Sequence, residues 1–151
     1  MFAHDPRFGL VVLSEIASRA LSPAVNDPGT AIDIIGTLVR LFVHWSAPQQ
    51  QEPEPATAPE CDRIFVPELS VADMFDDAFK GIARDGAGLL EVQVRLQKAL
   101  QTLAARDDDA MRIAAHRHAL SALARAEQAI TFEPDLVLIR RAAKITDRLD
   151  C

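Results

Sequence analysis

Residues 27–45 of the 151-residue chain read DPGTAIDIIGTLVRLFVHW, and this stretch decides the fold. Asp27 followed by Pro28 is a helix-start signal, because aspartate caps the first turn and proline is tolerated at the first helical position. The apolar residues that follow lie nearly all round a helix: Ile32, Ile34, Ile35, Leu38, Val39, Leu41, Phe42 and Val43. A helix without a polar face needs neighbours on several sides. We therefore predict that 28–45 is the central and most buried helix of a bundle.

The preceding residues predict a first helix. Asp5-Pro6 is a second start signal, and Ser22-Pro23 ends the helix, because proline disfavours helical backbone in the residue before it. The expected inward stripe has helical spacing and comprises Leu10, Leu13, Ala17, Ala20 and Leu21. The expected outward strip is polar and comprises Arg7, Ser14, Glu15, Ser18 and Arg19. Within it, Glu15 and Arg19 have the spacing of an ion pair.

Residues 47–60 (APQQQEPEPATAPE) show no apolar period and have the composition of a linker. We divide the chain into an N-terminal helical hairpin (1–46), a Pro/Gln/Glu-rich linker (47–62) and C-terminal helices (63–151) that pack on the first pair as one domain. The segment RIFVP at 63–67 allows at most one short isolated strand or hairpin. The expected fold is an all-α, single-domain bundle of about five or six helices.

Further helix signals follow the linker. Ser70 and Asp73 form a capping-box-like start, and the glycines within 85–88 end that helix. A fourth helix starts at about Leu89. The aspartates at 107–109 favour the start of a fifth helix, because the helix dipole attracts negative charge there. We expect this fifth helix to turn four residues inward: Ile113, Leu120, Leu123 and Ala124. A last helix is predicted from about Pro134 to Leu149.

The charge and the motifs exclude several functions. A net charge of −6 argues against a nucleic-acid partner. His116 and His118 are two positions apart on a helix and point to opposite faces, so they do not hold one metal together. No nucleophile–base arrangement and no glycine-rich phosphate loop is present. The sequence therefore predicts no catalytic residue, no metal and no cofactor.

The connection between the first two helices concentrates polar residues. Two interpretations stay open. In the first, the side chains end one helix and cap the next. In the second, they form a small-ligand or metal-binding site, with hydrolysis as a further option, built from Glu15, Arg19, Ser22, Asn26, Asp27 and Thr30.

Basic residues recur on the last predicted helix, at Arg140, Arg141, Lys144 and Arg148. In an acidic chain such a stripe is suited to contact anionic lipid headgroups or an acidic partner. A solvated face is the alternative, because basic side chains are favoured near the C-terminus of a helix.

Several motifs resemble the soluble region of a bacterial family of predicted membrane proteins, the domain of unknown function 2254. They are DPRFGL at 5–10, EIASRALSP at 15–23, NDP at 26–28 followed by Thr30-Ala31, and AFKGI at 78–82. Ala24 and Val25 depart from the family, which usually has glycine there. Alanine at 24 would be strained if the turn required positive φ at that position.

The resemblance implies a cytoplasmic domain of an inner-membrane protein, whose family members carry several N-terminal transmembrane helices. No segment of this chain reaches the roughly 18–20 apolar residues of a membrane span, so the fragment by itself is expected to be soluble. The implied role is non-enzymatic assembly, interaction or regulation, and the alternative is gating of a channel or transporter. The implied partners are the missing transmembrane region, other membrane-protein subunits or a second copy of the chain.

Overall fold

The computed structural model describes residues 6–47 and 69–143, which form six helices and no strand. The helices are α1 (Pro6–Ala20), α2 (Pro28–Trp45), α3 (Val71–Asp85), α4 (Leu90–Ala104), α5 (Asp109–Ala129) and α6 (Glu133–Ala143). The all-α prediction is confirmed. The predicted linker, apart from Ala47, and the strand near 63–67 lie outside the described residues, as does the chain from 144 onward.

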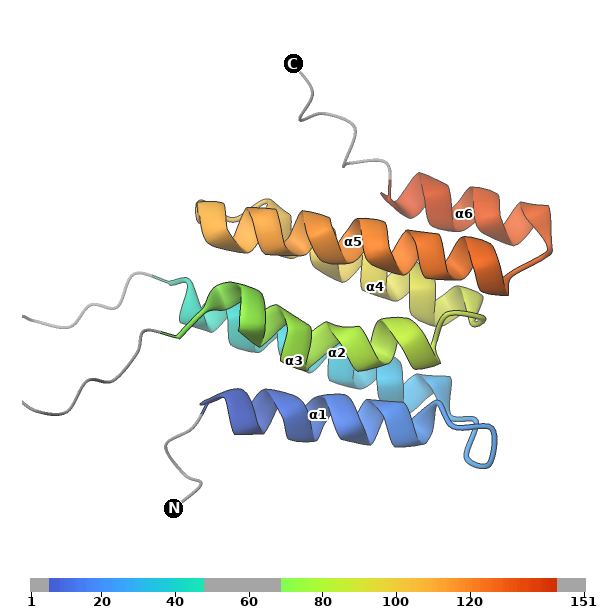
Figure 1. Cartoon of the computed structure of the whole chain (residues 1–151), viewed down its shortest axis with the longest axis horizontal. Coiled ribbons are helices and arrows are strands. Elements are labelled where there is room, and N and C mark those ends of the chain that lie inside the picture. Colours follow the sequence, from blue (N-terminus) through green and yellow to red (C-terminus); the bar gives the residue numbers. More distant parts are fainter. Residues whose placement is uncertain (1–5, 48–68, 144–151) are drawn as a thin grey trace, which may run out of the picture.

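The helices stack in layers (Figure 1). α2 packs beside α4, and α3 packs beside α5. α1 covers α2 and α3 from one side, while α6 lies on α4 and α5 from the other. Residues from the first pair of helices thus share one core with residues that follow the linker.

Three phenylalanines occupy the centre of this core. The ring of Phe75 lies 4.5 Å from that of Phe42 and 5.3 Å from that of Phe79, measured between centroids. All three side chains are at most 1% exposed. Because Phe42 belongs to α2 and the other two to α3, the rings join helices on opposite sides of the linker.

The expectation that α2 is the central and most buried helix is wrong. Ile35 and Leu38 are fully buried as expected, but Leu41 and Trp45 are 45% and 42% exposed. α4 has seven buried residues in a shorter helix, against five in α2. The reason is geometric: α2 packs mainly on α1 and α4 and lies at the side of the bundle, so its apolar surface exceeds what these two neighbours cover.

The predicted orientation of α5 is wrong for three of its four residues, while the fourth, Leu123, is half-buried against the smaller core cluster. Ile113 and Leu120 are 66% and 58% exposed, and Ala124 is exposed too. The buried face instead consists of Met111, Ala114, Ala115, His118, Ala119, Ala122 and Ala126. Alanines let neighbouring helices approach closely, so a surface of small residues packs against α3 and α4 although larger apolar residues are available.

α1 approaches α3 closely at Gly81. A Cβ atom at this glycine would lie 3.0 Å from Ser18 Oγ and 3.1 Å from Ser14 Oγ. Ser14 is buried and Ser18 is half-buried, so the expectation that Ser14 belongs to an outward strip is wrong. Small residues on both helices permit the contact. Glu15 and Arg19 form no ion pair with each other.

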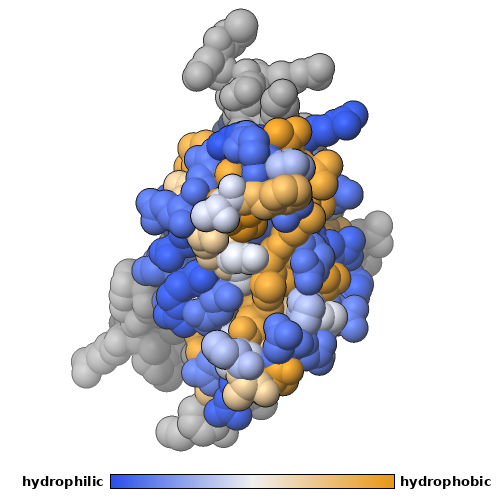
Figure 2. Space-filling model, turned by 90° about the vertical axis from the view of Figure 1, so that its right-hand side faces the viewer, coloured by the Kyte–Doolittle hydropathy of each residue, from blue (hydrophilic) through white to orange (hydrophobic). Residues whose placement is uncertain are grey.

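The end of the bundle with the α1–α2, α3–α4 and α5–α6 connections carries an apolar band between hydrophilic side chains (Figure 2). Among the exposed apolar residues of these connections are Val25, 59% exposed, and Phe132, 61% exposed. No helix within the described ranges has both the length and the apolarity needed to cross a bilayer.

Candidate functional site

Asp27 is the N-cap of α2, as predicted. One carboxylate oxygen accepts the backbone N–H of Thr30 at 3.1 Å, and the other accepts the Thr30 hydroxyl at 2.6 Å. The hydroxyl bond and then the backbone bond hold the pKa of Asp27 below its usual value. Both carboxylate oxygens are therefore engaged in holding the first turn of the helix.

The rest of the turn is also held by local bonds. The Ser22 hydroxyl donates to the Arg19 carbonyl at 2.7 Å, which helps to end α1. Asn26 has φ 47°, the left-handed conformation that asparagine tolerates better than most residues. The positive φ is thus at Asn26 and not at Ala24. Alanine at position 24, where the family usually has glycine, is therefore not strained.

The structure brings four predicted ligand residues into the turn: Ser22, Asn26, Asp27 and Thr30. Glu15 and Arg19 lie on α1 with exposed side chains. None of the six lines the cavities described below. Capping accounts for the bonds that Ser22, Asp27 and Thr30 make, and ligand binding at this turn stays a prediction.

The basic residues predicted on the last helix have different surroundings in the structure. Arg140 donates to Glu127 and to Glu133, both at 2.7 Å, so this guanidinium is neutralised within the bundle. Arg141 is exposed and lines a separate groove between helices. Lys144 and Arg148 lie outside the described residues.

A polar cavity between α3 and α5 was not predicted from the sequence. His118 Nε2 lies 2.9 Å from a carboxylate oxygen of Asp76, and Arg117 donates to the same oxygen at 2.7 Å. Because a carboxylate only accepts, this contact requires the proton on Nε2 of a neutral His118. The cavity has a volume of about 210 Å³ and is lined by Asp76, Lys80, Ala83, Arg117, His118, Ser121 and Arg125.

Burial has the largest effect on the pKa of His118. It lowers the pKa of the imidazole below its ordinary value, and nearby Arg117 and Lys80 lower it further. The hydrogen bond and charge of Asp76 act in the opposite direction but do not outweigh burial. No hydrogen bond joins Ser121 to His118, although both line the cavity. The described side chains therefore provide an imidazole–carboxylate pair without an attached nucleophile.

Protonation of His118 should weaken the fold as the pH falls. The unfolded chain binds this proton more tightly than the folded chain. The stability that the neutral imidazole contributes to the fold is therefore fully present above about pH 6.5. It is lost as the pH falls from there toward the lower folded pKa. We expect the melting temperature of His118→Gln to fall less than that of the wild type between about pH 7 and pH 5.

His116→Gln is the matched control, because it removes a histidine from the same helix outside the cavity. Its melting temperature should follow the wild-type pH profile. Identical profiles for His118→Gln and the wild type would contradict the assignment of the lowered pKa.

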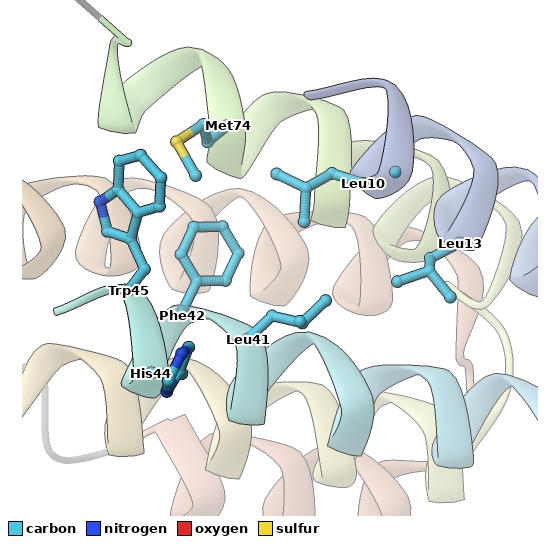
Figure 3. Close-up of a pocket in the computed structure, with 8 residues that line it drawn as sticks. Leu10, Leu13, Leu41, Phe42, His44, Trp45 and Met74 are labelled. Atoms are coloured by element: carbon cyan, nitrogen blue, oxygen red, sulfur yellow. The ribbon is translucent and has the colours of Figure 1, made fainter. Parts of the chain in front are cut away.

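A second cavity, of about 310 Å³, opens between α1, α2 and α3 (Figure 3). Its lining is almost entirely apolar and comprises Gly9, Leu10, Leu13, Leu41, Phe42, His44, Trp45 and Met74. The exposed residues Leu41 and Trp45 described above belong to this lining. The helical stripes predicted Leu10, Leu13, Leu41 and Phe42 only as core, because the sequence does not indicate where a layer of the bundle is incomplete.

The comparisons with known proteins yield one finding. A family model described as "Predicted membrane protein (DUF2254)" matches residues 1–102. No curated protein and no solved structure matches the chain.

Proposed function

The chain belongs to the DUF2254 family of predicted membrane proteins, and on this premise we propose that it is a non-enzymatic assembly domain. Its role is to bind an apolar helix from the membrane-embedded part of such a protein or from another subunit. We place the domain on the cytoplasmic side of a bacterial inner membrane. The site of binding is the apolar cavity between α1, α2 and α3.

The incomplete covering of α2 carries this proposal. Leu41 and Trp45 are 45% and 42% exposed beside a cavity whose other lining residues are mostly apolar. Apolar surface of this kind is costly in water and marks sites of association. Tryptophan in particular is enriched among the residues that dominate binding energy.

The shape of the cavity favours a helix as the occupant. Its walls are three helices (Figure 3), and apolar side chains spaced three and four apart on an incoming helix would fill the space between them. Few polar groups line the cavity, so a strongly polar ligand would lose its hydration without gaining hydrogen bonds.

Tryptophan fluorescence provides the test. Trp45 is the single tryptophan and the chain has no tyrosine, so the emission reports this cavity alone. We expect an uncharged, tryptophan-free amphipathic peptide of leucine and serine to shift the emission to shorter wavelength in a saturable manner. Leu41→Asn should weaken this binding about tenfold, which corresponds to roughly 1.4 kcal/mol.

Ile113→Asn is the matched control, because it makes the same kind of change at an exposed residue of α5. This variant should bind the peptide as the wild type does, and a peptide of scrambled order should not bind. Equal weakening by both variants, or no saturable shift, would refute the proposal. If Leu41→Asn instead converts a dimer of the chain to a monomer, the helix that occupies the cavity comes from a second copy.

A further inference from the structure

A groove on another face of the bundle is lined by α2, α4 and α6. It consists of two adjoining hollows of about 770 Å³ and 250 Å³, and Arg95 and Lys98 line both. Arg40 adds a third cation at one end and Arg141 a fourth at the other. We call this the cationic groove. Its basic residues come from three helices that are far apart in the sequence.

The cations of this groove have no ion-pair partner among the residues that the structure describes. Five other arginines do form ion pairs: Arg7, Arg84, Arg112, Arg117 and Arg140. Within the described ranges, Arg40 donates to the hydroxyl of Thr37, at 2.8 Å. Glu91 is the one carboxylate among the lining residues. In a chain with a net charge of −6, this local excess of positive charge favours an anionic ligand.

The groove also has an apolar part. Ile32, Leu90, Val94 and Leu138 line the larger hollow, and Leu138 is 49% exposed. Ile32 and Leu90 stand near the starts of α2 and α4, at the end of the bundle that carries the apolar band in Figure 2. Apolar side chains therefore adjoin the cations within one hollow.

We infer that the cationic groove binds an anionic phospholipid. The headgroup phosphate lies against Arg95 and Lys98, within reach of Arg40 or Arg141, and the acyl chains cover Ile32, Leu90, Val94 and Leu138. A free phosphate would leave the apolar residues uncovered, and a nucleic acid would place charge against them. Both parts of the groove are used only by a ligand that is itself part anionic and part apolar.

The inference goes beyond the proposed function and rests on it only for the membrane location. The groove uses α4 and α6, which do not line the cavity of the proposed helix-binding site. Leu41→Asn should therefore leave lipid binding unchanged, and substitutions in the groove should leave peptide binding unchanged. Failure of one proposal is thus distinguishable from failure of the other.

Sedimentation with lipid vesicles tests the inference, at about 0.15 M salt to screen weak long-range attraction. The chain should sediment with vesicles of phosphatidylglycerol and phosphatidylcholine, and should remain in solution with phosphatidylcholine alone. The double variant Arg95→Gln/Lys98→Gln should bind at least about tenfold more weakly. The control Arg84→Gln/Arg112→Gln changes the net charge equally outside the groove and should bind as the wild type does.

Two further measurements identify the ligand. Leu138→Gln should weaken vesicle binding if acyl chains occupy the groove, and inorganic phosphate should not compete with the vesicles. Equal losses in the two double variants would overturn the inference, as would equal binding to both vesicle types. Unchanged binding by Leu138→Gln, effective competition by phosphate, or tighter binding of a single-stranded oligonucleotide would also overturn it.

Discussion

Replacing Phe75 by alanine should lower the free energy of unfolding by about 3–5 kcal/mol. The side chain is fully buried, and its ring contacts Phe42, Phe79 and His118 at centroid distances of 4.5, 5.3 and 5.9 Å. Alanine would leave a cavity between α2, α3 and α5 that these rings cannot close. The loss is large because a domain has only about 5–15 kcal/mol of stability in total.

Urea unfolding followed by circular dichroism measures this effect. Phe132→Ala is the matched control, because it removes the same atoms from a ring that is 61% exposed. Its effect should stay within about 0.5 kcal/mol, as for most surface substitutions. Comparable losses in both variants would mean that the three-ring cluster is not the centre of the core.

Replacing Gly86 by alanine should destabilise the fold by about 1–3 kcal/mol. The added Cβ would lie 2.6 Å from Val92 Cγ1 and 3.0 Å from the carbonyl oxygen of Ile82. Neither atom yields easily, since valine is stiff in a helix and the carbonyl is part of the backbone. The Gly86 carbonyl also accepts a 3.0 Å bond from the buried amide of Gln93, so a shift of this turn would disturb a second contact.

Gly88→Ala is the control within the same turn. No atom lies within 4 Å of its added Cβ, and its φ is not positive. Alanine here should be neutral or stabilise by about 0.4–1 kcal/mol, through the unfolded state. Thermal unfolding of the two variants should therefore give changes of different sign or clearly different size. Similar melting temperatures would show that the α3–α4 turn adapts to a side chain at position 86.

Helix starts and stops are predictable from this sequence because capping is a local interaction. Asp27 accepts from a backbone N–H three residues ahead, and Ser70 and Asp108 do the same for α3 and α5. Each cap depends only on residues within one helical turn. The same locality explains why Asp27 was correctly predicted as the N-cap of α2.

The faces that helices bury are less predictable. The apolar surface of α2 predicted a central position with neighbours on several sides. In the structure α2 packs mainly on α1 and α4, and Leu41 and Trp45 are exposed. In α5 five alanines face inward, whereas Ile113 and Leu120 face outward. Hydrophobicity determines how much free energy a helix gains when its apolar surface is buried. Which face is buried depends on how closely that face fits the neighbouring helices.

The sequence by itself determined the helical class, the approximate starts of the helices in the described chain and the family. These features depend on local backbone preferences or on the order of residues alone. Only the tertiary structure decided which groups meet. His118 and Asp76 come together across α3 and α5, and Arg40, Arg95 and Arg141 line one groove from three helices. Cavities and unneutralised charges arise where packing is incomplete, and packing depends on contacts between residues that are distant in the chain.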